Sequence, residues 1–179
     1  MISFILLGIA ILIIKLWPII DKIKNPKKDL IIKKEDESLD RLFKEVENLK
    51  DKFEILKNTC LSDEFTEEQF DLVIIGESFV YTVDYKNGEG DIEADINSSY
   101  WKKISEGREY QFYNPIIRNK KKLENIRKII GKKPETREFK AYIVFSDEVQ
   151  KIEIDKSKVE KDIEIVKVRE FVEVLKNQK

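Results

Sequence analysis

Apolar positions are concentrated in the first twenty residues of the chain. Residues 2–20 carry one charge, that of Lys15, and otherwise consist of apolar or small side chains. As a helix this segment is about 28 Å long, close to the ~30 Å hydrocarbon core of a bilayer. Lys15 lies near one end, where its stem can reach the headgroups beside Trp17. The pattern predicts a transmembrane anchor over residues 1–20.

A cleaved signal peptide is the alternative, because residues 2–14 alone have the length of its apolar region. No basic residue precedes the segment, however, and no small-x-small cleavage site follows it. Lysines are frequent in residues 21–37, a predicted basic juxtamembrane linker that can attract anionic lipid headgroups. Because basic residues favour the cytoplasmic side, we expect a single-pass membrane protein whose C-terminal domain is cytoplasmic.

The remaining residues, 38–179, are predicted to form one folded domain that opens with a helix. Ser38 is a candidate N-cap for a helix over residues 39–58. Its apolar residues recur at steps of three and four, which gives one narrow stripe: Leu42, Val46, Leu49, Phe53 and Leu56. The stripe is expected to pack on the domain core. The alternative is a short coiled coil, and thus a homodimer through the Leu42–Leu56 helix stripe.

Extended and helical patterns then alternate along the chain. Two strand-like runs joined at Gly76-Glu77 predict a β-hairpin, and a third antiparallel strand follows. Asn114-Pro115 opens a helix whose residues Ile116, Leu123, Ile126 and Ile130 share one side, and Gly131 and Pro134 end it. The predicted elements are strands over 69–75, 78–86, 92–96, 140–145 and 163–168, a helix over 116–130, and a closing helix from about Glu170. This order predicts an α/β fold with a mixed sheet.

Composition narrows the chemistry that this domain can perform. The chain has no histidine, which excludes Ser-His-Asp and Cys-His nucleophiles and histidine-ligated zinc. Its single cysteine, Cys60, excludes an internal disulfide and a thiolate cluster. The formal net charge of -1 does not indicate a nucleic-acid binder. The groups that remain available for catalysis are carboxylates, lysines, hydroxyls and a metal ion bound by oxygen ligands.

Acidic residues interrupt both strands of the predicted hairpin. Asp71 lies in the first strand, and Asp84 lies two residues before Lys86 in the second, on the same strand face as that lysine. Pairing around Gly76-Glu77 brings positions 71 and 84 together. Two such carboxylates repel each other unless a cation such as Mg²⁺ lies between them. A metal-bound water as the nucleophile and a neighbouring lysine are the minimum set of groups that phosphodiester hydrolysis requires.

These residues resemble the PD-(D/E)XK nuclease pattern, and the wider layout is similar to the nuclease-related domain (NERD) family. The matching pieces are Gln69-Phe70-Asp71, Val83-Asp84-Tyr85-Lys86, Gly90-Asp91-Ile92, Trp101 and Asn114-Pro115-Ile116. Two later strands follow in the same order as in the family, so the similarity covers about residues 40–175. The resemblance implies a restriction-endonuclease-like mixed sheet flanked by helices, here preceded by one transmembrane helix. It also implies cleavage of DNA or RNA with Mg²⁺ or Mn²⁺.

The resemblance further implies roles for individual residues. Asp71, Asp84 and Glu45 would hold the metal, with Glu47 as a second choice for the third ligand, and Lys86 would serve the attacking water. The chain departs from the family pattern at Gln69, where Glu is usual, at Asp84 for Glu, and at Arg118 for Gln. These departures favour an alternative function, a catalytically weak or inactive nucleic-acid-binding or scaffold module.

Basic residues are frequent on the predicted helix 116–130. We expect four of them to contact nucleic-acid phosphate: Arg118, Lys120, Lys121 and Arg127. The alternative is an ordinary solvated helix face. Tyr100 and Trp101 are expected to pack in the core or in a lid, with a base-stacking platform as the alternative.

Overall fold

The computed structural model describes residues 26–49, 52–62, 67–130 and 137–178. Contacts divide the chain into two units, residues 1–37 and 38–179. Helix α2 (Pro26–Glu47) begins inside the predicted linker, so Ser38 is an internal helical residue and not an N-cap. The predicted anchor over residues 1–20 lies outside the described residues. Within the described ranges no helix is both long and apolar enough to cross a membrane.

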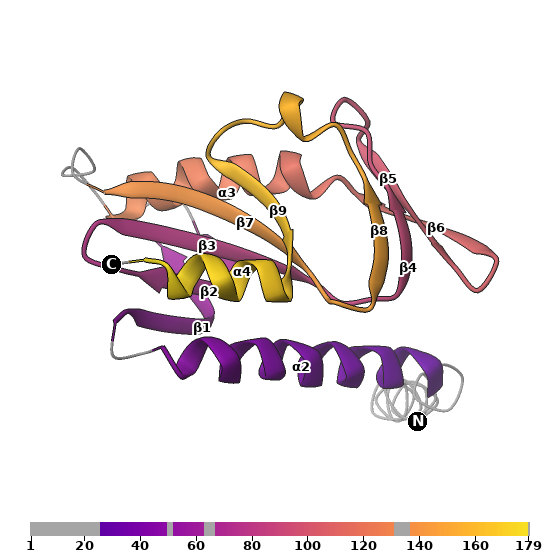
Figure 1. Ribbon diagram of the computed structural model, residues 1–179, viewed down its shortest axis with the longest axis horizontal. Helices are drawn as coiled ribbons and strands as arrows, with labels where there is room; N and C mark the ends of the chain where they lie inside the picture. Colours follow the sequence, from indigo (N-terminus) through magenta and orange to yellow (C-terminus); the bar gives the residue numbers. More distant parts are fainter. Residues whose placement is uncertain (1–25, 50–51, 63–66, 131–136, 179) are drawn as a thin grey trace, which may run out of the picture. The chain divides into compact units, whose positions relative to one another are not determined.

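The larger unit is built on a five-stranded mixed sheet (Figure 1). Its strands, in spatial order, are β1 (Glu54–Ser62), β2 (Glu67–Ile75), β3 (Phe79–Lys86), β7 (Glu138–Phe145) and β9 (Ile163–Lys167). β1, β2 and β3 pair antiparallel, and β3, β7 and β9 pair parallel. The predicted hairpin and the two predicted later strands are confirmed. The helix predicted over 39–58 is wrong beyond Glu47, because β1 begins at Glu54.

A second, four-stranded sheet continues from the ends of β3 and β7 (Figure 1). Its spatial order is β6 (Arg108–Tyr113), β5 (Tyr100–Ser105), β4 (Gly90–Glu93) and β8 (Val149–Glu153). β4 is therefore not the third antiparallel strand beside β3 that the sequence predicted; it pairs with β5 and β8 instead. Gly90 allows the close approach of β5, since a Cβ there would lie 2.1 Å from the carbonyl oxygen of Ile104.

The sequence analysis missed the β5–β6 hairpin. Ser105 pairs with Arg108, and the two residues between them, Glu106 and Gly107, have φ values of 50° and 70°. Positive φ at both central residues is the type I′ geometry that matches the twist of a hairpin. Glu-Gly was therefore the local signal, in a stretch whose many charged residues obscure the strand pattern.

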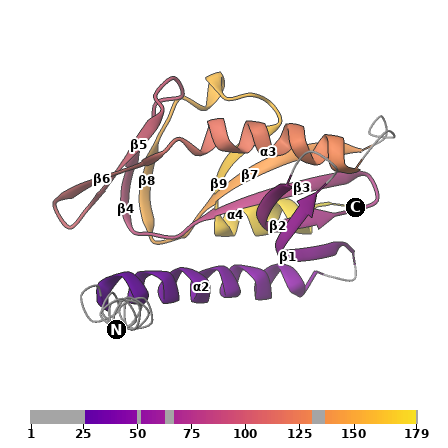
Figure 2. The ribbon, with the colours of Figure 1, turned by 180° about the vertical axis from the view of Figure 1, so that it is seen from behind.

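Helices cover both faces of the five-stranded sheet. Helix α3 (Pro115–Ile130) packs over β7 and β3 on one face (Figure 2), where Leu123 and Ile126 enter the core. On the other face, helix α4 (Val168–Lys176) and residues 38–47 of α2 bury Phe171, Leu42 and Val46. The predicted packing of the Leu42 stripe on the core is confirmed for Leu42, Val46 and Phe53.

Two further expectations about helix faces are wrong. The Leu42–Leu56 stripe does not lie on one helix, because Leu56 belongs to β1, so it cannot form the seam of a coiled coil. Ile130 is exposed and does not join Ile116, Leu123 and Ile126 in the core. The reason is its place in the last turn of α3, which ends there.

Candidate active site

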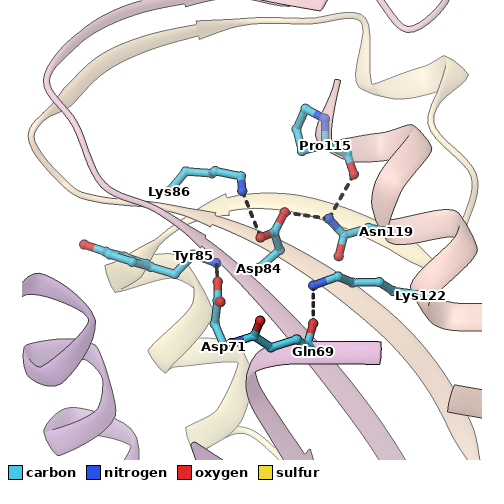
Figure 3. Close-up of polar contacts among 8 residues, drawn as sticks. All are labelled: Gln69, Asp71, Asp84, Tyr85, Lys86, Pro115, Asn119 and Lys122. Atoms are coloured by element: carbon cyan, nitrogen blue, oxygen red, sulfur yellow. Dashed lines mark hydrogen bonds and ion pairs between the residues drawn. The ribbon is translucent and has the colours of Figure 1, made fainter. Parts of the chain in front are cut away.

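Asp84 is a buried carboxylate near the end of β3, only 3% exposed. Side chains alternate along β3, so Tyr85 points to the α2 and α4 side while Asp84 points toward α3. Its Oδ1 accepts a hydrogen bond from Lys86 Nζ at 2.8 Å, and its Oδ2 accepts one from Asn119 Nδ2 at 2.9 Å (Figure 3). A buried charge is tolerated only when it is paired and hydrogen-bonded, and both conditions hold here.

Asp71 lies where the β2–β3 ladder ends. The last ladder pair is Leu72 with Val83, and the next residues outward are Asp71 and Asp84, as the sequence predicted. The Asp71 carboxylate accepts the Tyr85 backbone N–H at 2.8 Å (Figure 3). Burial raises the pKa of Asp71; the Tyr85 N–H opposes this shift and the negative charge of Asp84 adds to it. The two acids are therefore electrostatic neighbours, although each carboxylate has its own hydrogen-bond partners.

Lys122 is a second cation at this place, and it was not among the site residues predicted from the sequence. It is 3% exposed, its Nζ donates to the backbone oxygen of Gln69 at 2.5 Å, and it lies 5.3 Å from the centroid of the Phe70 ring. Burial lowers the pKa of Lys122, while the charges of Asp84 and Asp71 act in the opposite direction. Lys122 thus fixes the backbone just before Asp71 and adds positive charge beside both acids.

Backbone contacts set the position of the site. Asn114 caps α3 by accepting the Ile116 N–H at 2.9 Å, which starts the helix one turn before Asn119. The loop after Lys86 is held by buried Ser146, whose backbone N–H donates to the Lys86 carbonyl at 3.0 Å. The Ser146 hydroxyl donates in turn to the Gly88 carbonyl at 2.5 Å. Strand, loop and helix therefore hold Asp84 and Lys86 from several directions.

The structure brings together only some of the residues that the sequence singled out. Asp71, Asp84 and Lys86 are neighbours, but Glu45 is exposed on α2, the helix whose buried residues pack on the opposite sheet face. Across the described ranges, no three acidic or cysteine side chains gather closely enough to hold a metal ion. Glu45 is therefore not joined to the pair as a third ligand, and Glu47 is likewise exposed on α2.

The four predicted phosphate contacts fall into two kinds. Lys120 and Arg127 form ion pairs with Glu160 at 2.5 Å and with Asp162 at 2.7 Å. Arg118 and Lys121 are exposed, and neither forms an ion pair with any residue that the structure describes. Arg118 lies close enough to Lys122 for its charge to contribute to the lowered pKa of that lysine, after burial. Arg118 therefore interacts with the buried lysine that lies beside the acids.

Asn119 and Lys122 are the site residues that the sequence reasoning missed. Both occupy the buried side of α3 with Ile116 and Leu123, at the helical spacing 116, 119, 122 and 123. A polar residue on an otherwise apolar stripe was the available signal. Asn119 is fully buried, and its Oδ1 has no hydrogen-bond partner among the described residues.

The donor set is suited in kind to a hard divalent cation. It consists of oxygens only, namely the Asp71 and Asp84 carboxylates with the unpartnered amide oxygen of Asn119 nearby. Mg²⁺ commonly takes one or two protein carboxylates and completes its coordination with water and substrate phosphate. Two acids on adjacent strands are therefore sufficient protein ligands for such an ion.

Comparison with known protein families identifies the family of this chain. The family model described as nuclease-related domain matches residues 33–146, more than half of the chain. The chain belongs to the nuclease-related domain (NERD) family. The resemblance inferred from the sequence is confirmed, and the matched part of this NERD domain contains Asp71, Asp84, Lys86, Asn119 and Lys122.

No curated protein and no solved structure matches the chain. The architecture of this NERD domain is confirmed as mixed α/β, with two mixed sheets and flanking helices. The finer prediction of a restriction-endonuclease-like sheet stays a prediction. The roles of the individual site residues also stay predictions, since the family match does not test them.

Proposed function

We propose that this NERD domain hydrolyses phosphodiester bonds of DNA or RNA with Mg²⁺ or Mn²⁺. One observation carries the proposal: a 3%-exposed carboxylate, Asp84, lies between the Lys86 ammonium and the Asn119 amide, directly beside Asp71. Burying an ionised group in this way is costly, so such sites commonly have a chemical role. The family supports the reaction class, because it is nuclease-related.

In this proposal each residue of the chain has a distinct part. Asp71 and Asp84 would hold the cation, which when bound lowers the pKa of a water and offsets charge on the phosphate. Lys86, 2.8 Å from Asp84, would orient the attacking water and balance the negative charge that develops on the phosphate. Lys122 would hold the end of β2 in place through the Gln69 carbonyl. Arg118 would contact a neighbouring phosphate.

Cleavage assays with the full chain in detergent test this proposal. Supercoiled plasmid, single-stranded DNA and RNA are incubated with Mg²⁺, Mn²⁺ or EDTA, using the wild type, Asp84→Asn and Lys86→Met. We expect metal-dependent cleavage by the wild type and at least about a 100-fold loss in both variants. Glu93→Gln, an exposed acid on β4, is the matched control and should cleave like the wild type. Equal cleavage by Asp84→Asn would refute the assigned site.

A second candidate is a nucleic-acid-binding module without efficient catalysis. Both carboxylate oxygens of Asp84 already accept hydrogen bonds within the protein, which favours this candidate. Gln69 favours it as well, because the family pattern has an acidic residue at this position. Calorimetric titration with Mn²⁺ separates the two candidates. Metal binding that is lost in Asp84→Asn supports the nuclease, whereas nucleic-acid affinity without metal binding supports the module.

We also propose a membrane location for the chain. The apolar residues 2–20, with one lysine among them, and the lysine-rich stretch that follows support a single-pass anchor with residues 38–179 on the cytoplasmic side. A nuclease in this arrangement would act on nucleic acid at the inner membrane surface.

A further inference from the structure

Two exposed tyrosines form a pair on the β5–β6 hairpin. Tyr100 is 56% exposed and Tyr113 is 49% exposed. They are cross-strand partners on the hairpin face opposite to buried Trp101, and their ring centroids lie 5.9 Å apart at an interplanar angle of 85°. Tyrosine is enriched at binding interfaces, because its ring can be covered by a partner while its hydroxyl stays in contact with water.

The pair is attached to a rigid base. Asn114, fully buried and next to Tyr113, donates from Nδ2 to the carbonyl oxygens of Ile96 at 3.2 Å and Ser98 at 2.7 Å. Its backbone N–H donates to the Ser99 carbonyl at 2.9 Å. The loop that leads into Tyr100 is therefore tied to the residue that follows Tyr113. The backbone that carries the two rings is therefore ordered before a ligand binds, which lowers the entropic cost of binding.

The pair adjoins the start of α3, where an unpaired cation lies. Tyr113 directly precedes the N-cap Asn114, and Arg118 is the fourth residue of the helix. In a hydrophobic staple, the side chains at the positions of Tyr113 and Arg118 contact each other. Arg118 is exposed and has no ion-pair partner among the described residues, whereas Lys120 and Arg127 are paired. The charge of Arg118 reaches Lys122, which in turn is influenced by Asp84 and Asp71. The aromatic pair thus adjoins the first turn of α3, which carries Arg118, and the same helix carries Asn119 and Lys122 beside the acids.

We propose that Tyr100 and Tyr113 form a docking surface for an unpaired base of a single-stranded nucleic acid, whose phosphate Arg118 contacts. This inference rests on the proposed function and names its substrate class. A single strand is favoured because its bases can turn their faces to an aromatic side chain, whereas both faces of a base inside a duplex are covered by neighbouring bases. The positive charge of Arg118 complements the phosphate that accompanies each base.

Equilibrium binding of oligonucleotides to the full chain in detergent tests the inference. Fluorescence anisotropy is measured in EDTA, so that no cleavage occurs, with a labelled single strand and with the same sequence as a blunt duplex. We expect tighter binding of the single strand, and an affinity about ten-fold lower for Tyr100→Ala and for Tyr113→Ala. Tyr113→Phe keeps the ring and should bind like the wild type.

Tyr110→Ala is the matched control. Tyr110 is 47% exposed on the same hairpin, but it pairs with Lys103 and lies on the other face. It should bind like the wild type, and thermal denaturation checks that all four variants are folded. Equal losses in Tyr110→Ala and Tyr113→Ala, or tyrosine variants that bind like the wild type, overturn the inference while leaving the proposed function intact. A wild type that binds neither single strand nor duplex also overturns the inference, and the proposed function is then decided separately by the cleavage assay with Mg²⁺ or Mn²⁺.

Discussion

Asn119 donates a hydrogen bond from its amide to Asp84 across the gap between helix α3 and strand β3, at 2.9 Å. The same Nδ2 donates to the Pro115 carbonyl at 2.9 Å, so the first turn of α3 and the buried acid are fixed to each other through one side chain. Asp84 is held from its own strand as well, by Lys86. The carboxylate is thus oriented before any ligand arrives, which is what a site for a metal and a phosphate requires.

Replacing Asn119 by alanine should weaken both the fold and the site. Loss of the amide leaves Asp84 Oδ2 and the Pro115 carbonyl without this donor, which we expect to lower the free energy of unfolding by about 1–3 kcal/mol. Urea denaturation measures this loss, and calorimetry should show weaker Mn²⁺ binding. Glu124→Ala, an exposed position on the same helix, is the control and should change neither quantity. Stability like that of the wild type would contradict the anchoring role of Asn119.

The raised pKa of Asp71 makes a prediction about stability and pH. Burial is the main cause of the shift. Between the ordinary aspartate pKa of 3.8 and the higher pKa of the folded state, Asp71 binds more protons in the folded state than in the unfolded state. Its contribution to stability is therefore complete below pH 3.8 and is lost as the pH rises through the folded pKa. In EDTA, the wild type should lose stability relative to Asp71→Asn across this window, as measured by urea denaturation at a series of pH values.

Asp155 provides a control of opposite sign for the same experiment. Its pKa is lowered, first by the Ser157 hydroxyl and then by Lys158, so the wild type should gain stability relative to Asp155→Asn as the pH rises toward 3.8. A difference between the wild type and Asp71→Asn that does not change with pH would show that Asp71 titrates alike in the folded and unfolded chain.

Lys122 should affect the protonation of Asp71 even though it forms no hydrogen bond with it. The positive charge of Lys122 opposes the burial that raises the pKa of Asp71, so Lys122→Met should raise this pKa further. Carbon-13 NMR titration of the aspartate carboxyl groups measures the change. Lys121→Met removes an exposed charge at the next position of the helix and should leave the pKa of Asp71 as it is. A lower pKa of Asp71 in Lys122→Met would contradict this placement of the charges.

The part of the fold that could be predicted depends on short-range pattern. Two apolar strands separated by Gly76-Glu77 fix their own register, and with it the neighbourhood of Asp71 and Asp84. The prediction of a helix over 39–58 was wrong because it also relied on local pattern. The spacing of Leu42 and Val46 continues through Leu49, Phe53 and Leu56, although the chain turns after α2 and enters β1. Spacing alone does not reveal such a break when no Gly or Pro marks it.

The missed part of the site depends on contacts between distant residues. Lys122 belongs to a run of three lysines, and lysine is among the residues least often buried. Its burial follows from the Gln69 carbonyl and the Phe70 ring, which lie more than fifty positions earlier. Glu45 was assigned from the family pattern, and the structure places it on a helix over the other sheet face. Neither outcome can be derived from local sequence.

The single cysteine offers a direct test of the proposed anchor and its orientation. Cys60 is exposed on β1, inside the part of the chain that we expect in the cytoplasm. The Glu67 side chain raises the pKa of the Cys60 thiol, so labelling requires a long reaction time. In bacterial spheroplasts that express the full chain, a membrane-impermeant maleimide should label Cys60 only after the membrane is permeabilised.

The chain should also stay in the membrane fraction through alkaline carbonate extraction. Ile9→Arg places a charge near the centre of residues 2–20 and should insert poorly, whereas Ile9→Leu should insert normally. Labelling of intact spheroplasts would contradict the proposed orientation, and a shortened chain in the surrounding medium would indicate the cleaved signal peptide.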